Sequence, residues 1–226
     1  MRGALVFAFL AIPTLGHAHF ALKTPAAYSV QDAQGLPLKS APCGQADPAT
    51  PLVATNMVTD YHVGDTVTVT VDETIFHPGH YRVAIAQDQT GLPADPLVTA
   101  GATPCGTAAI QDSTTTGVIV DNMLDHNTAF NAPQSFTFQL PAGMTCTNCT
   151  LQIVEFMSNH ALNNPGGCFY HHCAQVNILP LEAPLPDAGA VTGAPADAAG
   201  SHLIPVSGGC NVGGNGAGFG LVLAVG

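Results

Sequence analysis

The stretch VGDTVTVTVDETI at positions 63–75 constrains the fold of this chain more than any other feature. Val67, Val69 and Val71 alternate there with threonines. Side chains of a β-strand point alternately to opposite faces, so this period of two predicts a strand with one buried face. Such a strand must cover its apolar face with a second layer, and the pattern therefore favours a β-sandwich.

Short β-rich segments recur through the rest of the region from His19 to Leu179. Pro, Gly, Asn and Asp separate them, and none shows the 3.6-residue period of a long helix. In the segment HYRVAIAQ we expect Tyr81, Val83 and Ile85 to point inward. The segments predicted as strands are 63–75, 80–87, 135–141, 150–157 and 174–180, with one more near 117–120 in the irregular stretch 88–133. They predict an all-β fold, an antiparallel, immunoglobulin- or fibronectin-like β-sandwich with long loops.

The first eighteen residues, MRGALVFAFLAIPTLGHA, have the pattern of a signal peptide. Arg2 precedes an apolar run that Pro13 interrupts, and Gly16-His17-Ala18 offers small residues at the −3 and −1 positions of a cleavage site. The run is too short to span a membrane as a helix. We therefore expect export, a secreted or cell-surface location, and a mature chain that begins at His19.

The composition changes after Pro180. Residues 181–209 are rich in Pro, Ala and Gly and lack apolar periodicity, which is typical of a linker. The expected organisation is a signal peptide at 1–18, a β-sandwich domain at 19–180, this linker, and a glycine-rich tail at 210–226. Gly208-Gly209-Cys210 resembles the sorting signals of myxobacterial surface proteins, which implies anchoring through Cys210, although the apolar run and arginine cluster of such signals are absent.

Seven cysteines lie beyond the expected signal peptide: Cys43, Cys105, Cys146, Cys149, Cys168, Cys173 and Cys210. In an exported protein, cysteines are expected to form disulfides. The first six could pair completely, and their 15 connectivities stay open at this point. The Cys146-Thr-Asn-Cys149 spacing also occurs in zinc sites and redox dithiols, but export and the four other core cysteines favour a disulfide-stapled domain.

The charge balance limits the partners of the chain. It carries four basic and fifteen acidic residues, and beyond residue 18 the only basic ones are Lys23, Lys39 and Arg82. A surface with so few cations cannot neutralise phosphates, which excludes nucleic acid and disfavours anionic lipid. Neutral polysaccharides are compatible with this composition.

A histidine at the start of a mature chain has special chemistry. His19 would offer its α-amine and its Nδ1 together in one chelate ring, and an α-amine with a pKa of about 8 has a usable neutral fraction near neutral pH. Copper favours nitrogen ligands in a tetragonal arrangement. One further imidazole would complete a three-nitrogen site, a histidine brace.

Two histidines flank a Pro-Gly turn in TIFHPGHYRVAIA at 74–86. His77 and His80 are both candidates for the second imidazole, because a turn between two strands can hold a ligand rigidly. The alternative is that both histidines are simply polar residues of the turn and bind no metal. His171 and His172 are adjacent in a predicted strand and face opposite sides, so we expect surface or packing roles for them. No context assigns a role to His62, His126, His160 or His202.

These segments together resemble the lytic polysaccharide monooxygenases, in particular myxobacterial monooxygenase-like proteins and animal-type chitin-active enzymes. The second copper ligand of that family, on a His-x-Gly-His turn, matches His77. Its axial aromatic residue lies five positions before an aspartate whose place Gln175 takes here, which gives Tyr170, or Phe169 if the loop shifts by one. The resembling segments are His19-Phe20, PCG at 42–44, HPGHYR at 77–82, LPAGMTCTNCTLQIVEF at 140–156 and CFYHHCAQVNI at 168–178.

The resemblance implies one mononuclear copper, held by the α-amine and Nδ1 of His19 and by His77, with Tyr170 near the axial position. It further implies that these three residues are catalytic, and that an external electron donor and a polysaccharide surface, chitin or another neutral glycan, are partners. Glu155, or Gln152 on the same strand, is expected to support the site from behind.

The chain also departs from the family pattern. It has no tryptophan, Gln175 replaces an acid, and Ile153 stands where relatives often carry tryptophan. These departures reduce the aromatic surface on which a sugar could stack. Two other functions therefore stay open: a non-catalytic copper-binding or copper-acquisition protein built on the same brace, and a metal-free glycan-binding surface module.

Overall fold

The computed structural model describes residues 19–45, 50, 52–111 and 117–181. The expected signal peptide, the expected tail with Cys210, and the expected linker beyond residue 181 lie outside the described residues. Within the described ranges no helix is long and apolar enough to cross a membrane.

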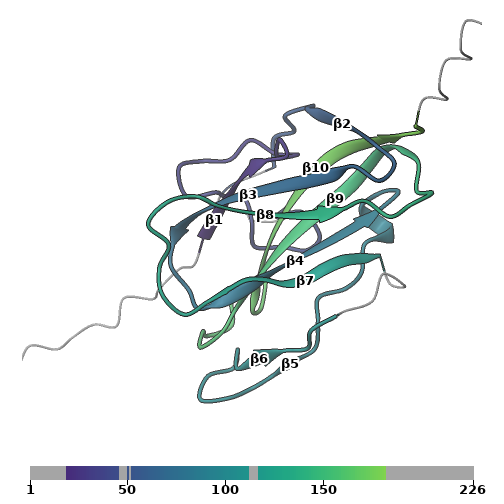
Figure 1. Cartoon of the computed structure of the whole chain (residues 1–226). Coiled ribbons are helices and arrows are strands. Elements are labelled where there is room, and N and C mark those ends of the chain that lie inside the picture. The colour runs from purple at the N-terminus through teal and green to yellow at the C-terminus, as the bar shows by residue number, and fades with distance from the viewer. Residues whose placement is uncertain (1–18, 46–49, 51, 112–116, 182–226) are drawn as a thin grey trace, which may run out of the picture. The chain divides into compact units, whose positions relative to one another are not determined.

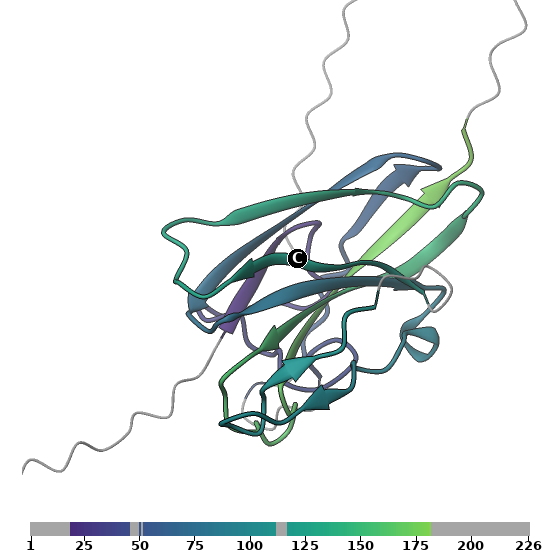
Figure 2. The same ribbon diagram turned by 60° about the horizontal axis from the view of Figure 1, so that its bottom comes forward.

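Two β-sheets form the domain (Figure 1). The smaller sheet has the order β1-β3-β8, and the larger has the order β2-β10-β9-β4-β7. A two-stranded hairpin, β5-β6, lies outside both layers, as Figure 2 shows from a second direction. The strands are β1 (His19–Thr24), β2 (Val58–His62), β3 (Thr66–Ile75), β4 (Gly79–Ala86), β5 (Val98–Thr99), β6 (Thr107–Ala108), β7 (Val118–His126), β8 (Gln134–Gln139), β9 (Cys146–Met157) and β10 (Phe169–Leu179).

This architecture confirms the all-β sandwich predicted from the alternating pattern. Each segment predicted as a strand overlaps one, although β9 and β10 begin several residues earlier than expected and β7 continues to His126. The pairing is not purely antiparallel, because β2 runs parallel to β10. These two strands lie far apart in the sequence, so no short turn imposes an antiparallel pairing.

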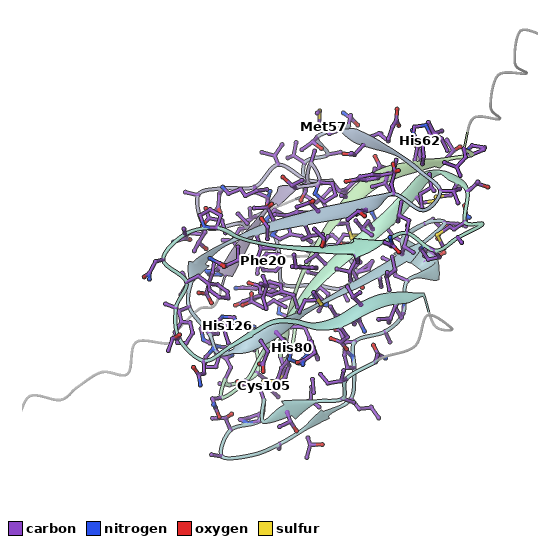
Figure 3. The ribbon with its side chains drawn as sticks, viewed as in Figure 1. Phe20, Met57, His62, His80, Cys105 and His126 are labelled. Carbon is purple, nitrogen blue, oxygen red and sulfur yellow. A yellow bond between two sulfur atoms is a disulfide. The ribbon has the colours of Figure 1, made fainter. Side chains whose placement is uncertain are left out.

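The core lies between the two sheets and follows the expected alternation. Val67, Val69 and Val71 of β3 are completely buried, and so are Tyr81 and Val83 of β4. Figure 3 shows Phe20 of β1 between the layers. Each fully buried side chain of this size stabilises the fold by roughly 1.5–3 kcal/mol relative to an exposed one.

The six cysteines from Cys43 to Cys173 form three disulfides, as predicted. Cys43 bonds to Cys173 and Cys105 to Cys168, so two distant loops are joined to β10 and to the residue before it. Cys146 bonds to Cys149 at the start of β9. The sequence predicted which cysteines pair but left the connectivity open, since only the fold brings the loops to β10.

The outer face of the larger sheet is covered by the irregular stretch that follows β4. Arg82 is buried there and donates to the Ala94 carbonyl at 3.0 Å and to Gln111 Oε1 at 2.6 Å. On β10 the ring of His171 lies 2.8 Å from Asp95 Oδ1 on this face, while His172 lies 3.0 Å from the Phe20 carbonyl on the opposite face. Both histidines are completely buried, so of the two roles expected for them the packing role is confirmed.

Candidate metal centre

His19 is the first residue of β1 and lies against the end of β3. It pairs with Ile75, and Thr74 Oγ1 donates a hydrogen bond to the His19 carbonyl at 3.0 Å. The side chain is 5% exposed. Its ring stacks on the ring of Tyr170, with centroids 5.3 Å apart and planes inclined by 22°. The structure thus brings two of the three predicted site residues into contact.

Tyr170 belongs to the inner face of β10. It is completely buried, and its hydroxyl donates to Asn163 Oδ1 at 3.4 Å. Phe169, the alternative aromatic residue, points to the opposite face, where its ring lies 5.5 Å from the ring of Phe156. The alternation of β10 therefore favours Tyr170 as the aromatic neighbour of His19.

His77 lies in the turn between β3 and β4, two residues after the partner of His19. Its backbone N–H donates to Glu73 Oε1 at 3.2 Å, and its side chain is 8% exposed. Its ring meets the ring of His160 edge to face, with centroids 4.5 Å apart. His160 is a residue to which the sequence assigned no role. His160 pairs with the distant Cys105, and no local sequence pattern predicts that its loop would reach His77.

His80 occupies a different environment from His77. Its Nε2 lies 3.5 Å from Asp121 Oδ1, and its ring packs 5.3 Å from the ring of Phe156 on the outer face of the larger sheet. Tyr81, the next residue, points into the core with Tyr170. The sheet therefore separates His80 from the stack of His19 and Tyr170, which favours His77 as the second imidazole.

A buried carboxyl group lies beside Tyr170. Glu155 on β9 pairs with Tyr170 on one side and with Tyr81 on the other, and it is completely inaccessible. Burial, and then the negative charge of Glu73, raise the pKa of Glu155 well above its usual value. Gln152 points the other way, toward Arg82 and the Pro42 carbonyl. Of the two residues expected to support the site, only Glu155 faces the same side as Tyr170.

The residues present fit a nitrogen-ligated copper. Within the described ranges no three His, Cys, Asp or Glu side chains converge as a metal-binding group. A histidine brace draws only two imidazoles from side chains and takes its third nitrogen from the α-amine. His19 and His77 supply two imidazoles that are both more than nine-tenths buried and lie on adjoining segments. An all-nitrogen donor set of this kind suits copper.

No family model matches the chain, and no curated protein matches it. Among solved structures, it is similar to a lytic polysaccharide monooxygenase AA15 from Thermobia domestica in the Cu(I) state, with a TM-score of 0.41, 17% identity, and coverage of 62% of this chain and 77% of that one. It is also similar to fusolin from the spindles of a Wiseana entomopoxvirus, with a TM-score of 0.33 and 14% identity. That match covers 65% of this chain and 49% of fusolin, about half of its length. What this chain binds is therefore inferred from its own side chains.

Proposed function

We propose that the mature protein is a secreted copper protein of the lytic polysaccharide monooxygenase type, which oxidises a glycan. The stack of His19 on Tyr170, beside the turn that carries His77, is the observation that supports this function. It agrees with the site that the sequence resemblance implies, in which the same three residues hold one copper.

Each residue of the centre has a separate part in this proposal. The α-amine and Nδ1 of His19 and one imidazole nitrogen of His77 would hold the metal, and the Tyr170 ring would lie next to it. Bound copper supplies the one-electron chemistry that activates oxygen or peroxide toward a C–H bond, with electrons from an external donor. The Tyr170 ring excludes water from one side of the site, and the hydrogen bond from Thr74 fixes the backbone of His19.

A non-catalytic copper carrier is the second candidate, and one observation favours it. No phenylalanine or tyrosine among the described residues is exposed, and the exposed large apolar side chains are all aliphatic or methionine. A sugar chain would therefore find no fully exposed aromatic platform on the described surface. A metal-free glycan-binding module would lack that platform as well.

Mass spectrometry of the exported protein, followed by copper titration, tests the centre. We expect a chain that begins at His19 and binds one Cu(II). Adding one residue before His19 should abolish the chelate, because the α-amine then lies out of reach. Equal copper affinity of the extended and natural chains would refute the brace.

Catalysis needs a separate assay. The copper-loaded protein is incubated with chitin, cellulose and other glycans together with ascorbate and peroxide, and oxidised oligosaccharides are sought. The extended chain is the matched control. Oxidised product from the natural chain alone supports the monooxygenase, whereas tight copper binding without product from any glycan would assign the protein to the carriers.

A further inference from the structure

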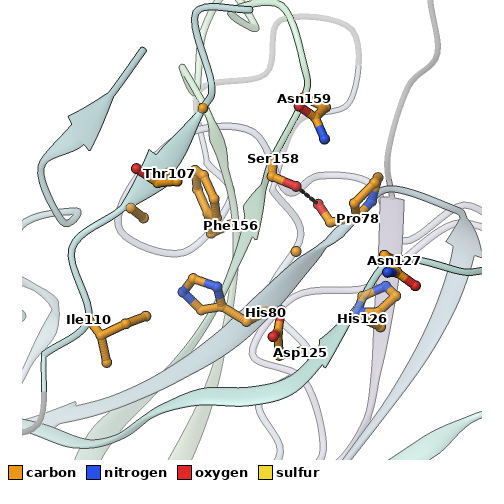
Figure 4. A pocket seen from close by; sticks show the side chains of 13 residues that line it. Pro78, His80, Thr107, Ile110, Asp125, His126, Asn127, Phe156, Ser158 and Asn159 are labelled. Carbon is orange, nitrogen blue, oxygen red and sulfur yellow. Dashed lines mark hydrogen bonds between the residues drawn. The ribbon is translucent and has the colours of Figure 1, made fainter. Parts of the chain in front are cut away.

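A cleft of about 510 Å³ lies on the outer face of the larger sheet, and Figure 4 shows the side chains that line it. We name it the His80 cleft. Its volume is within the range of small-molecule sites, roughly 300–1,000 Å³. Pro78 and Asn159 line it, and they are the direct chain neighbours of His77 and His160, whose rings are in contact. The residues that matter for its chemistry are His80, Thr107, Asp125, Asn127, Phe156 and Asn159.

His80 forms a rigid, polar part of the cleft. Its side chain is 9% exposed, and its ring is held between Phe156 and the carboxylate of Asp121. Figure 4 shows the ring lining the cleft near Asp125. Its Nδ1 has no hydrogen-bond partner among the described residues. This nitrogen is therefore available for a hydrogen bond with a ligand.

The cleft is lined by one exposed carboxylate, Asp125, and by the ring of His126, which is itself paired with Glu73. Burial lowers the pKa of His80, and His126 adds to this effect, although Asp121 and Asp125 act to raise it. Asp121 accepts the backbone N–H groups of Gln111 and Asn122 and interacts with the buried Arg82. Asp125 is exposed and accepts no hydrogen bond among the described residues. No lysine or arginine among the described residues lines the cleft, and Glu73 balances the charge of His126.

The other walls suit a polyhydroxylated ring. Thr107, Asn127 and Asn159 can each donate and accept hydrogen bonds, as sugar hydroxyls require. Phe156 is nearly buried and adds only a small apolar contact to the lining. A neutral sugar would leave Asp125 without a counter-charge, whereas an ammonium group on the ring would supply one.

We propose that the His80 cleft binds one amino-sugar residue through its free ammonium group, as a recognition subsite for partly deacetylated glycans. The ammonium lies at Asp125, and the hydroxyls meet Thr107 and the two asparagines. The net charge of −11 attracts such a cationic glycan over a longer range. The subsite rests on the proposed function only in taking a glycan as the substrate that reaches the copper.

Calorimetric titration of the copper-free protein tests the subsite. The probes are a glucosamine tetramer, its fully N-acetylated counterpart and a glucose tetramer, at about pH 6 so that amines are protonated and carboxylates ionised. We expect the glucosamine tetramer to bind more tightly than both neutral probes. Asp125→Asn should weaken its binding about tenfold, because a charge-assisted hydrogen bond is lost. Ala108→Trp, on the rim strand β6, should fill the cleft and abolish binding.

Asp72→Asn is the matched control. It removes the same charge from the solvent face of β3, where Asp72 pairs with Lys23 at 3.4 Å, and it should leave binding unchanged. Equal loss in Asp125→Asn and Asp72→Asn would mean attraction to the acidic surface in general and would overturn the subsite. Equal binding of all three tetramers, or of none, would also overturn it.

His77→Ala separates this inference from the proposed function. His77 does not line the cleft, so the variant should lose copper and still bind the glucosamine tetramer. If copper binding fails in the natural chain while Asp125-dependent binding remains, the subsite stands without the monooxygenase. If the natural chain binds copper and shows no Asp125-dependent binding, the subsite alone is refuted.

Discussion

Glu73 holds His126 across the two sheets, with its Oε1 2.9 Å from the ring Nε2. The Nδ1 of His126 lies 2.8 Å from the Leu124 carbonyl, so both ring nitrogens face acceptors, as in a protonated imidazole. Burial opposes the charge on each partner, but their mutual interaction raises the pKa of His126 and lowers that of Glu73. The same carboxylate accepts the backbone N–H groups of His77 and Phe130. One side chain therefore fixes the turn that carries a candidate copper ligand.

Replacing Glu73 should destabilise the fold and loosen this turn. For Glu73→Ala we expect a loss of about 2–3 kcal/mol in the free energy of unfolding, because the buried ring of His126 and two backbone N–H groups lose their acceptor. Urea titration of the copper-free protein measures it. Asp72→Asn, one residue earlier on β3, breaks an exposed ion pair and should cost less than about 1 kcal/mol. Similar losses in both variants would show that Glu73 has no special role.

The two turn histidines should differ in their effect on copper. His77→Ala should lower copper affinity at least tenfold, since His77 adjoins the end of β1, while His80→Ala should leave it nearly unchanged. Competition with a copper chelator measures both affinities. The reverse order would reassign the second ligand to His80.

Acid should destabilise the copper-free protein through His172. Burial, and then the neighbouring His171, lower the pKa of His172 to about 4, although its bond to the Phe20 carbonyl opposes the shift. In the unfolded chain His172 therefore takes up a proton near pH 6.5, whereas in the folded chain it stays neutral until about pH 4. Stability should fall by about 3 kcal/mol as the pH drops through this window.

Urea titrations across that pH range measure the slope of the free energy of unfolding against pH. His172→Gln keeps a donor for the Phe20 carbonyl and cannot gain a proton, so its slope should be flatter. His126 acts in the opposite direction, because its raised pKa makes its contribution largest at low pH and lost as the pH rises. A variant slope equal to that of the natural chain would assign the acid sensitivity to other groups.

The three disulfides should differ in what their removal costs. The Cys43–Cys173 bond spans 130 residues and the Cys146–Cys149 bond spans three. Loop entropy in the unfolded chain predicts a stabilisation of about 5 kcal/mol for the first and about 2 kcal/mol for the second. Paired Cys→Ser variants, compared by thermal unfolding, test this order. Equal costs would mean that native-state packing, rather than loop length, sets the contribution of each bond.

Sequence patterns predicted the sandwich because its strands have a local signature. Val67, Val69 and Val71 alternate over consecutive residues, and such a period needs no knowledge of distant contacts. β1 and β2 are short and lack that alternation, so neither was predicted from its pattern. The parallel partner of β2 depends wholly on long-range packing.

The candidate site was predicted unevenly for the same reason. His77 could be predicted because it lies beside a Pro-Gly turn that is visible in the local sequence. Tyr170 was predicted from the family resemblance and not from a periodic pattern of residues. His160 and His126 were missed because their partners, His77 and Glu73, lie 83 and 53 residues away in the sequence and meet them only in the folded chain. No spacing rule connects residues on separate loops or separate sheets.

The alternation along β10 has a consequence for how this chain can change. Phe169 and His171 point to the outer face of the larger sheet, while Tyr170 and His172 point to the inner one. Inserting or deleting one residue ahead of this run would turn every ring to the other side, and His19 would face a different partner. Substitutions alter one face at a time, whereas a change in length alters the metal side and the loop-covered side together.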